Sequence, residues 1–124
     1  MNSINTEKFI KTQKDLINAY RAAVSAAVRH SGYGEREAEL LLDIFDGESI
    51  ACNPENSTAE RLVNEKMAEP DADGTLCLTG RGAIAAKSLS QNRQRFFEGA
   101  FKNISSEELF IFGSVLEKIC RNLA

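Results

Sequence analysis

The chain has 124 residues, of which 43% are hydrophobic and 27% charged, and its formal net charge at pH 7 is −3. This composition is that of an ordinary globular domain and excludes a disordered chain. No apolar run approaches the roughly 20 residues that a bilayer-spanning helix needs, and the N-terminus lacks the order of a signal peptide. We therefore predict a cytoplasmic protein with no membrane partner.

The first predicted helix covers residues 5–30. Asn5 is a good N-cap residue, and Ile4 and Phe9 are placed to form a hydrophobic staple across the helix start. Apolar residues then recur at helical spacing, and two glycines within residues 30–34 end the helix. A helix of about 25 residues is about 37 Å long. This is more than a small domain needs, which indicates that a partner covers part of it.

The middle of the chain predicts two helices and a short hairpin. An apolar face over residues 35–45 predicts the second helix, and residues 48–56, with a proline and two asparagines, predict a loop. Ser57 opens a capping-box sequence that starts a third helix through Met67. A turn and a strand at residues 75–78 follow.

Two further helices complete the predicted order. Thr79 is placed to cap the fourth helix, and Ser105 opens a second capping box before the fifth. Apolar residues in the fifth helix alternate in steps of three and four, and Ile111 and Val115 widen that face. A face this wide exceeds what one neighbour covers, so it is a second indication of a dimer.

The cysteines are odd in number and widely spaced. Cys52, Cys77 and Cys120 form no Cys-x-x-Cys pair, which is typical of reduced thiols rather than of a disulfide framework or zinc site. The leucines on both sides of Cys77 predict that it is buried. Acidic residues near Cys52 disfavour a reactive thiolate, so neither position favours redox sensing.

Other candidate chemistry is sparse. His30 is the single histidine, which argues against a histidine-based metal site or catalytic triad. Residues 80–88 follow a strand and open a helix, but Arg81 and Ala86 replace the glycines of a phosphate-binding loop. Arg81 at a helix start remains a weak candidate for anion binding. We predict no enzyme, no catalytic residue, no metal and no cofactor.

The order of elements resembles the MarR family, dimeric winged-helix regulators of bacterial transcription. Residues 76–82, Leu-Cys-Leu-Thr-Gly-Arg-Gly, are similar to the strand that leaves the wing and the start of the long helix that follows. Residues 105–109 resemble the start of the family's last helix, residues 39–47 its second element, and residues 57–64 the start of its recognition helix.

The resemblance implies a mainly α, MarR-like winged-helix homodimer with at most a reduced two-stranded wing. Residues 1–124 would form a single domain, with dimerisation helices at 5–30 and 80–124 and a degenerate winged helix-turn-helix at 35–78. It implies DNA contacts from Ser57, Thr58, Arg61 and Lys66. It implies a dimer interface that includes Phe9, Leu16, Tyr20, Leu109, Phe112, Leu116, Ile119 and Leu123.

The sequence departs from the family in its middle. Too few residues precede Thr79 for a full helix-turn-helix and wing, and the turn at 71–74 is acidic. Residues 35–75 carry twelve acidic and three basic residues, a balance of −9, while the rest of the chain carries twelve basic and six acidic residues, or +6. DNA affinity depends on basic groups at phosphates, so this balance opposes DNA binding.

Three functions therefore remain open. The first is a dimer that binds operator DNA through the helix at residues 57–68. The second is a MarR-like dimer that no longer reads DNA and acts through protein contacts of its acidic middle, as an antirepressor, a DNA mimic or the partner of another regulator. The third is a small-molecule or enzymatic role for a pocket between the helices.

Overall fold

The computed structural model describes residues 5–53 and 55–124. Its helices are α1 (Thr6–Val28), α2 (Glu35–Phe45), α3 (Ser57–Asn64), α4 (Gly80–Ala100) and α5 (Ser106–Leu123), and its strands are β1 (Ala68–Pro70) and β2 (Leu76–Leu78). The predicted order and the mainly helical fold class are confirmed. The predicted staple with Ile4 lies outside the described residues.

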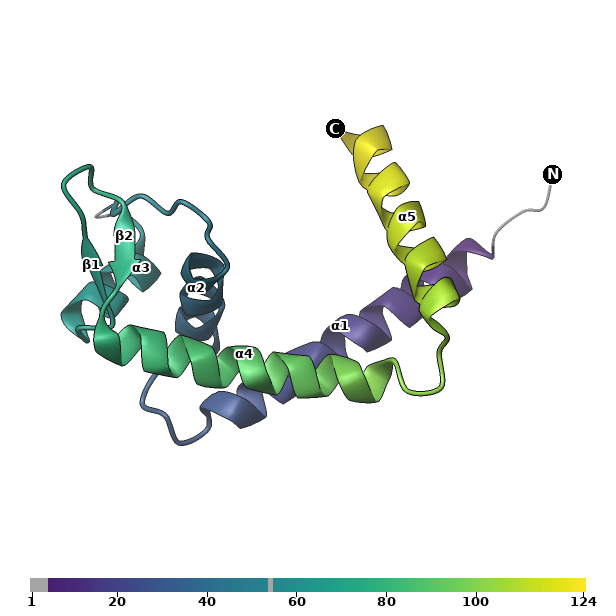
Figure 1. Cartoon of the computed structure of the whole chain (residues 1–124), viewed down its shortest axis with the longest axis horizontal. Coiled ribbons are helices and arrows are strands. Elements are labelled where there is room, and N and C mark those ends of the chain that lie inside the picture. The colour runs from purple at the N-terminus through teal and green to yellow at the C-terminus, as the bar shows by residue number, and fades with distance from the viewer. Residues whose placement is uncertain (1–4, 54) are drawn as a thin grey trace.

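The molecule is elongated, with a winged-helix module at one end (Figure 1). The module comprises residues 35–78, which hold α2, α3 and the hairpin. The long helix α4 runs from the module toward the other end, where α1 crosses it, and α5 turns away from both (Figure 1). The shape separates one compact end from three extended helices.

Side-chain caps fix most helix starts. The side chains of Asn5, Thr79 and Ser105 accept hydrogen bonds from the backbone N–H groups of Lys8, Gly82 and Glu108, respectively, as predicted. These bonds satisfy amide groups that have no partner within the helix.

The boundaries of α3 differ from the prediction at both ends. Its N-cap is Asn56, whose Oδ1 accepts from the Ala59 N–H at 3.1 Å, rather than Ser57. It ends at Asn64 instead of continuing to Met67, because Lys66 takes a left-handed φ of 61° that interrupts the helix. The helix therefore has only eight residues.

The two strands form an antiparallel hairpin in which Ala68 pairs with Leu78 and Pro70 with Leu76. The Asp71 carboxylate accepts from the N–H groups of Asp73 and Thr75 at 2.8 and 3.0 Å, which closes a tight turn. This hairpin is the short wing that the sequence predicts. An isolated bridge between Ala51 and Thr75 extends the pairing.

Cys77 is exposed, and the prediction that it is buried is wrong. Along β2, Leu76 is buried, Cys77 is exposed and Leu78 is half-buried. Successive side chains of a strand point to opposite faces, and one face of this small sheet is solvated. Flanking leucines therefore place Cys77 on the side away from the core.

The core lies where the module meets the first half of α4. Leu41 of α2 and Leu62 of α3 are fully buried, and Leu76 and Leu89 bring β2 and α4 into the same cluster. By contrast, α5 has no buried residue. Among the described residues, no helix is both long enough and apolar enough for a membrane span.

Candidate nucleic-acid interface

The outer face of α3 consists of Ser57, Glu60, Arg61 and Asn64. Ala59 and Leu62 are fully buried, so the opposite side of the helix faces solvent. Ser57 and Arg61 were predicted to face DNA, and both are exposed. Asn64 is equally exposed and was missed, although helical spacing from Ser57 (seven residues, two turns) would have identified it. Asparagine can pair with an adenine edge in a DNA groove.

Thr58 and Lys66 lie elsewhere. Thr58 is half-buried beside the outer face. Lys66 follows α3 and lines a shallow depression together with Arg81 at the start of α4. The backbone carbonyl of Lys66 accepts from Thr79 Oγ1 at 2.6 Å, which holds this turn against α4. The structure thus brings Lys66 and Arg81 together but separates them from the outer face of α3.

Arg61 forms an ion pair with Glu37. Its Nη1 lies 3.0 Å from Oε1 of Glu37. The arginine side chain remains 67% exposed, whereas that of Glu37 is only 7% exposed. Glu37 is the one charged residue among the described residues that belongs to the buried set. No local pattern in the sequence indicates this pair, whose members are 24 positions apart on different helices.

The two helices of the module are not joined by the tight turn of a helix-turn-helix. In that motif a turn of three or four residues joins the two helices. Here residues 46–56 separate α2 from α3, and within their described part no helix intervenes. The shortened middle that the sequence indicates is therefore an irregular connection between α2 and α3. Acidic side chains dominate the surface around it, with Glu60, Glu65, Glu69, Asp71 and Asp73 all exposed.

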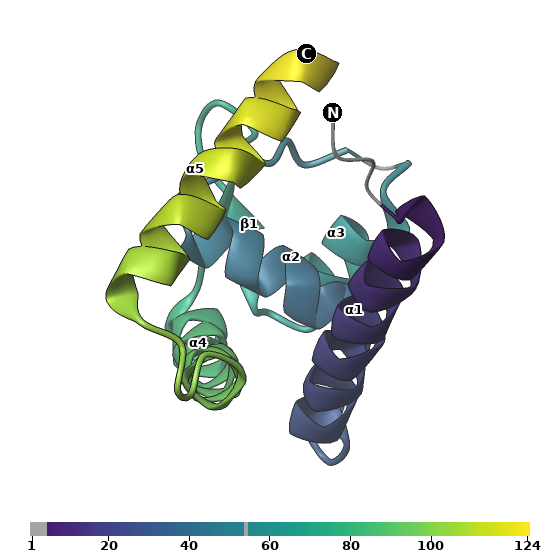
Figure 2. The same ribbon diagram turned by 90° about the vertical axis from the view of Figure 1, so that its right-hand side faces the viewer.

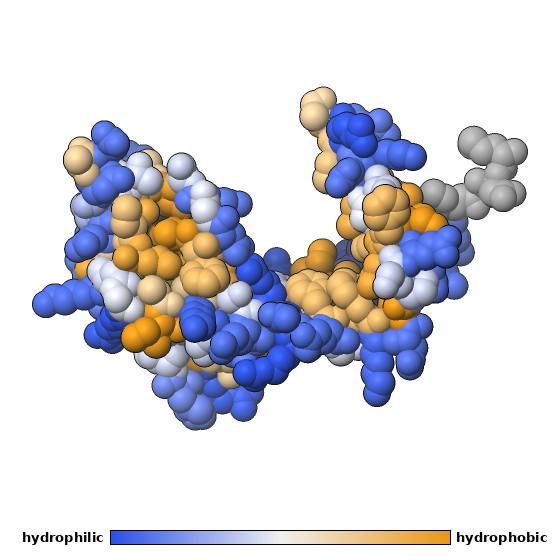
Figure 3. Space-filling model, viewed as in Figure 1, coloured by the Kyte–Doolittle hydropathy of each residue, from blue (hydrophilic) through white to orange (hydrophobic). Residues whose placement is uncertain are grey.

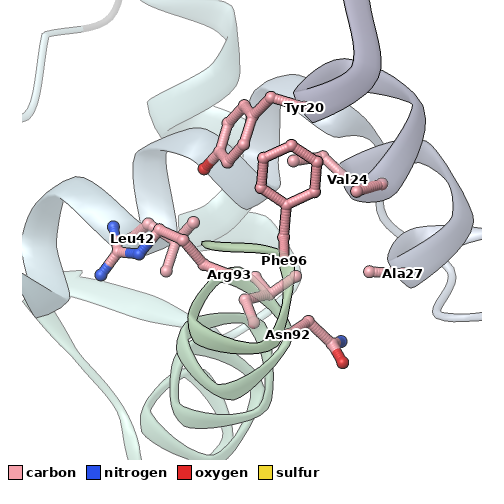
Figure 4. A pocket seen from close by; sticks show the side chains of 9 residues that line it. Tyr20, Val24, Ala27, Leu42, Asn92, Arg93 and Phe96 are labelled. Carbon is pink, nitrogen blue, oxygen red and sulfur yellow. The ribbon is translucent and has the colours of Figure 1, made fainter. Parts of the chain in front are cut away.

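A small pocket lies between α1, α2 and α4 (Figure 4). Tyr20, Val24 and Ala27 line it from α1, and Arg93 and Phe96 line it from α4. Its lining is mostly apolar, and Tyr20 and Phe96 pack edge to face with ring centroids 5.5 Å apart.

Arg93 closes one end of this region through a bidentate ion pair. Its Nη1 and Nη2 donate to the two carboxylate oxygens of Asp46 at 2.8 and 2.9 Å. These hydrogen bonds from Arg93 lower the pKa of the Asp46 carboxyl below its ordinary value of 3.8. The pair ties the end of α2 to the middle of α4.

Apolar side chains gather outside the module. Hydrophobic surface surrounds the junction of α1, α4 and α5 and continues along α5 (Figure 3). Viewed from the end of α4, α5 stands apart from α1 (Figure 2). Of the eight predicted interface residues, Tyr20 and Leu109 are half-buried and the other six are exposed, from 38% for Ile119 to 82% for Leu123.

The titratable residues outside these regions form no further cluster. All three cysteines are exposed, and so is His30. Across the described residues, no group of three or more histidine, cysteine or carboxylate side chains is arranged to hold a metal ion. Cys77 has Asp71 as a neighbour, with Sγ 3.9 Å from Oδ2.

Comparison with known proteins identifies the fold. Neither a family model nor a curated protein matches the chain. Among solved structures, a protein from Listeria monocytogenes assigned to the MarR family and complexed with a 26mer DNA has a TM-score of 0.79 at 11% identity, covering 99% of this chain and 90% of that one. A MarR family protein from Bacillus stearothermophilus has a TM-score of 0.78 at 13% identity, covering 99% and 98%.

A third structure, the oxidized form of MarR from E. coli, has a TM-score of 0.64 at 18% identity and covers 96% of both chains. The resemblance to the MarR-like winged-helix fold is therefore confirmed over nearly the whole chain. These three neighbours are named as MarR proteins, and none of their names is that of an enzyme. At such identities the similarity concerns the fold, and function has to be argued from the surface.

Proposed function

We propose that this protein is a homodimeric transcription regulator of the MarR type that contacts DNA through α3. The proposal combines two arguments, one about the extended helices and one about the module.

The exposed surface supports the homodimer. A compact monomer of 13.6 kDa has an accessible surface of about 6,600 Å², whereas this chain exposes 9475 Å². The excess, about 2,900 Å² per chain or about 5,800 Å² for two copies, is of the size that a large obligate interface buries. Most exposed large apolar residues lie on α1 and α5, outside the module. A second copy of the chain, related by a two-fold axis, would cover them, with residues 5–30 and 80–124 as the dimerisation segments.

The observation that carries the DNA proposal is the outer face of α3. Its exposed side chains are a hydroxyl, an amide, a guanidinium and the carboxylate of Glu60. The first three are groups that bind base edges and phosphates, whereas the carboxylate opposes phosphate contact. The similar fold from Listeria monocytogenes is complexed with DNA. A dimer would present two copies of α3, as the two half-sites of an operator require. Lys66 and Arg81 would add phosphate contacts beside each copy.

The net negative charge of the module determines the affinity and salt dependence that we expect for DNA binding. With a balance of −9 over residues 35–75, few phosphates are neutralised, so we expect weak affinity that falls further as salt rises.

The test is selection from a pool of random duplexes of about 30 base pairs, long enough for two half-sites one turn apart. Anisotropy titrations of the selected duplex follow at several salt concentrations. Binding by the wild type should weaken with salt, and Arg61→Glu should weaken it by about tenfold or more. Arg95→Glu makes the same charge reversal on α4 and should change binding far less. A pool that yields no enriched duplex would contradict the proposal.

A second function is favoured by the charge distribution. An acidic module on a dimer whose remaining segments are basic suits contact with a basic protein surface, as in an antirepressor, a DNA mimic or the partner of another regulator. The same titration separates the two, because this alternative predicts no DNA binding even at low salt. The pocket beside Arg93 supplies no comparable argument for a small-molecule role.

A further inference from the structure

We infer that Glu37 is a positioning residue for Arg61: the buried carboxylate of α2 fixes the guanidinium of α3 in the orientation in which it meets DNA. The inference rests on the proposed DNA contact through α3.

The asymmetry of the ion pair is the first step. An ion pair between two exposed side chains leaves both partners free to move. Here Glu37 is buried, with a side chain only 7% exposed, so one end of the pair is fixed by the protein core. Its carboxylate lies at the start of α2, where Cβ of a residue larger than glycine at position 34 would be 3.0 Å from Oε2. The acceptor thus sits in a confined place.

The second step concerns the hydrogen-bond donors of Arg61 that do not contact Glu37. A guanidinium has five N–H donors in a planar fork. The pair engages Nη1 at 3.0 Å, and the side chain is still 67% exposed. One amino group of the guanidinium is thus held near Glu37, and the remaining donors are available to a phosphate or base. Restricting a flexible side chain before binding removes an entropy penalty that would otherwise weaken the complex.

The third step is the shortness of α3. A helix of eight residues offers only four side chains on its outer face, and Arg61 is the one whose charge favours DNA, beside the opposing charge of Glu60. Its orientation then has a large share in the contact. Glu37 and Arg61 also join α2 to α3, which lack the tight turn of a complete helix-turn-helix.

A double-mutant cycle on the selected duplex tests this inference. Glu37→Asp keeps the charge and shortens the side chain by one methylene, so it breaks the contact without changing the electrostatic potential. We expect it to weaken binding by about three- to tenfold, the effect of freeing one long side chain. In an Arg61→Ala background the same substitution should change the dissociation constant by less than about twofold.

Glu35→Asp is the matched control, because Glu35 is exposed on the same helix end and should be replaceable without effect. Equal losses in both Arg61 backgrounds would mean that Glu37 is merely structural. Unchanged or tighter binding by Glu37→Asp would mean that the carboxylate sequesters the arginine or does nothing. Either result overturns the inference while leaving the DNA proposal intact. No binding by the wild type would overturn both.

A measurement on the unmodified protein covers the case in which Glu37→Asp fails to fold. The ¹⁵N relaxation of arginine Nε groups reports side-chain order on the ps–ns timescale. We expect Arg61 to be markedly more ordered than Arg36, an exposed arginine on α2 for which the described residues show no ion pair. Equal mobility of the two would overturn the inference whatever the variants do.

Discussion

At the scale of single residues, Gly82 controls how closely α4 approaches the hairpin. A Cβ at this position would lie 1.8 Å from the backbone oxygen of Met67 and 2.8 Å from its carbonyl carbon. Thr79 occupies the same junction, because its hydroxyl accepts from the Gly82 N–H at 3.1 Å while its own N–H donates to Met67 at 3.1 Å. The only way to accept a side chain is to move α4 away from β1.

We predict that Gly82→Ala lowers the free energy of unfolding by at least about 1 kcal/mol, as expected for overpacking against rigid backbone. Gly80→Ala is the control, since Gly80 is two residues earlier on the same helix and has no atom within 4 Å of its Cβ position. It should change stability by less than about 0.5 kcal/mol. Urea unfolding followed by circular dichroism measures both, and equal stability of the two variants would show that the junction yields easily.

Cys77 and Arg61 illustrate what the sequence does and does not reveal at this scale. Strand alternation alone would have placed Cys77 on the solvent side, because its neighbours Leu76 and Leu78 face the core. The prediction of burial was wrong because it took the two leucines as a sign that Cys77 lies on their side. The partner of Arg61, by contrast, could not be predicted from the sequence. A contact between Glu37 and Arg61 depends on how α2 and α3 pack, and no local pattern encodes the angle between two helices.

At the scale of elements, the ion pair between Asp46 and Arg93 connects the module to α4. The two hydrogen bonds from Arg93 lower the pKa of the Asp46 carboxyl. A carboxyl whose pKa is lower in the folded state stabilises that state above its ordinary pKa, and the contribution disappears as the pH falls through the folded value. The relevant window therefore lies below about pH 4.

We predict that Asp46→Asn lowers the free energy of unfolding at pH 7 by less than about 1 kcal/mol, because both side chains remain partly exposed. The difference from the wild type should stay constant down to about pH 5 and shrink below about pH 4. Glu39→Gln, an exposed position on the same helix, should show no such change. Urea unfolding across this pH range measures the effect, and a difference that persists at the acid end would refute the assignment.

The elements themselves followed closely from the sequence. Helical periodicity and capping residues located α1, α2, α4 and α5 because both signals are local. The predicted end of α3 was wrong because Lys66 adopts a left-handed backbone conformation. Lysine seldom adopts this conformation, so the residue type does not predict it. Its start was shifted by one residue because Asn56 and Ser57 are both good N-caps, and the choice between them depends on packing.

At the scale of the whole molecule, the extended helices α1 and α5 leave a large apolar surface uncovered. Apolar residues on them are exposed by 38% to 82%, and α5 buries none of its residues within the chain. The wide apolar face of α5 was predicted from the sequence. A helix with apolar residues around half its circumference needs more than one neighbour to cover them. The long connection between α2 and α3 was harder to predict, because an irregular segment has no periodic pattern.

We predict that the protein sediments as a dimer at micromolar concentration and that Leu116→Glu makes it monomeric. Leu116 lies in the middle of α5 and is 42% exposed in the single chain, and a carboxylate there would be buried without a partner in the dimer. Phe45→Glu is a closely matched control, because Phe45 is apolar and 43% exposed but lies at the end of α2 in the module. It should leave the sedimentation of the dimer unchanged.

Folding and association are expected to be coupled, because so much of the apolar surface of α1 and α5 lacks a cover in one chain. The urea midpoint of the wild type should then rise with protein concentration, as mass action requires when only the folded state associates. For Leu116→Glu the midpoint should be lower and independent of concentration. A wild type that sediments as a stable monomer, or a midpoint that does not move over a hundredfold range of concentration, would exclude the dimer. Because a single copy of α3 cannot span two half-sites, that result would also remove the geometric basis for operator recognition.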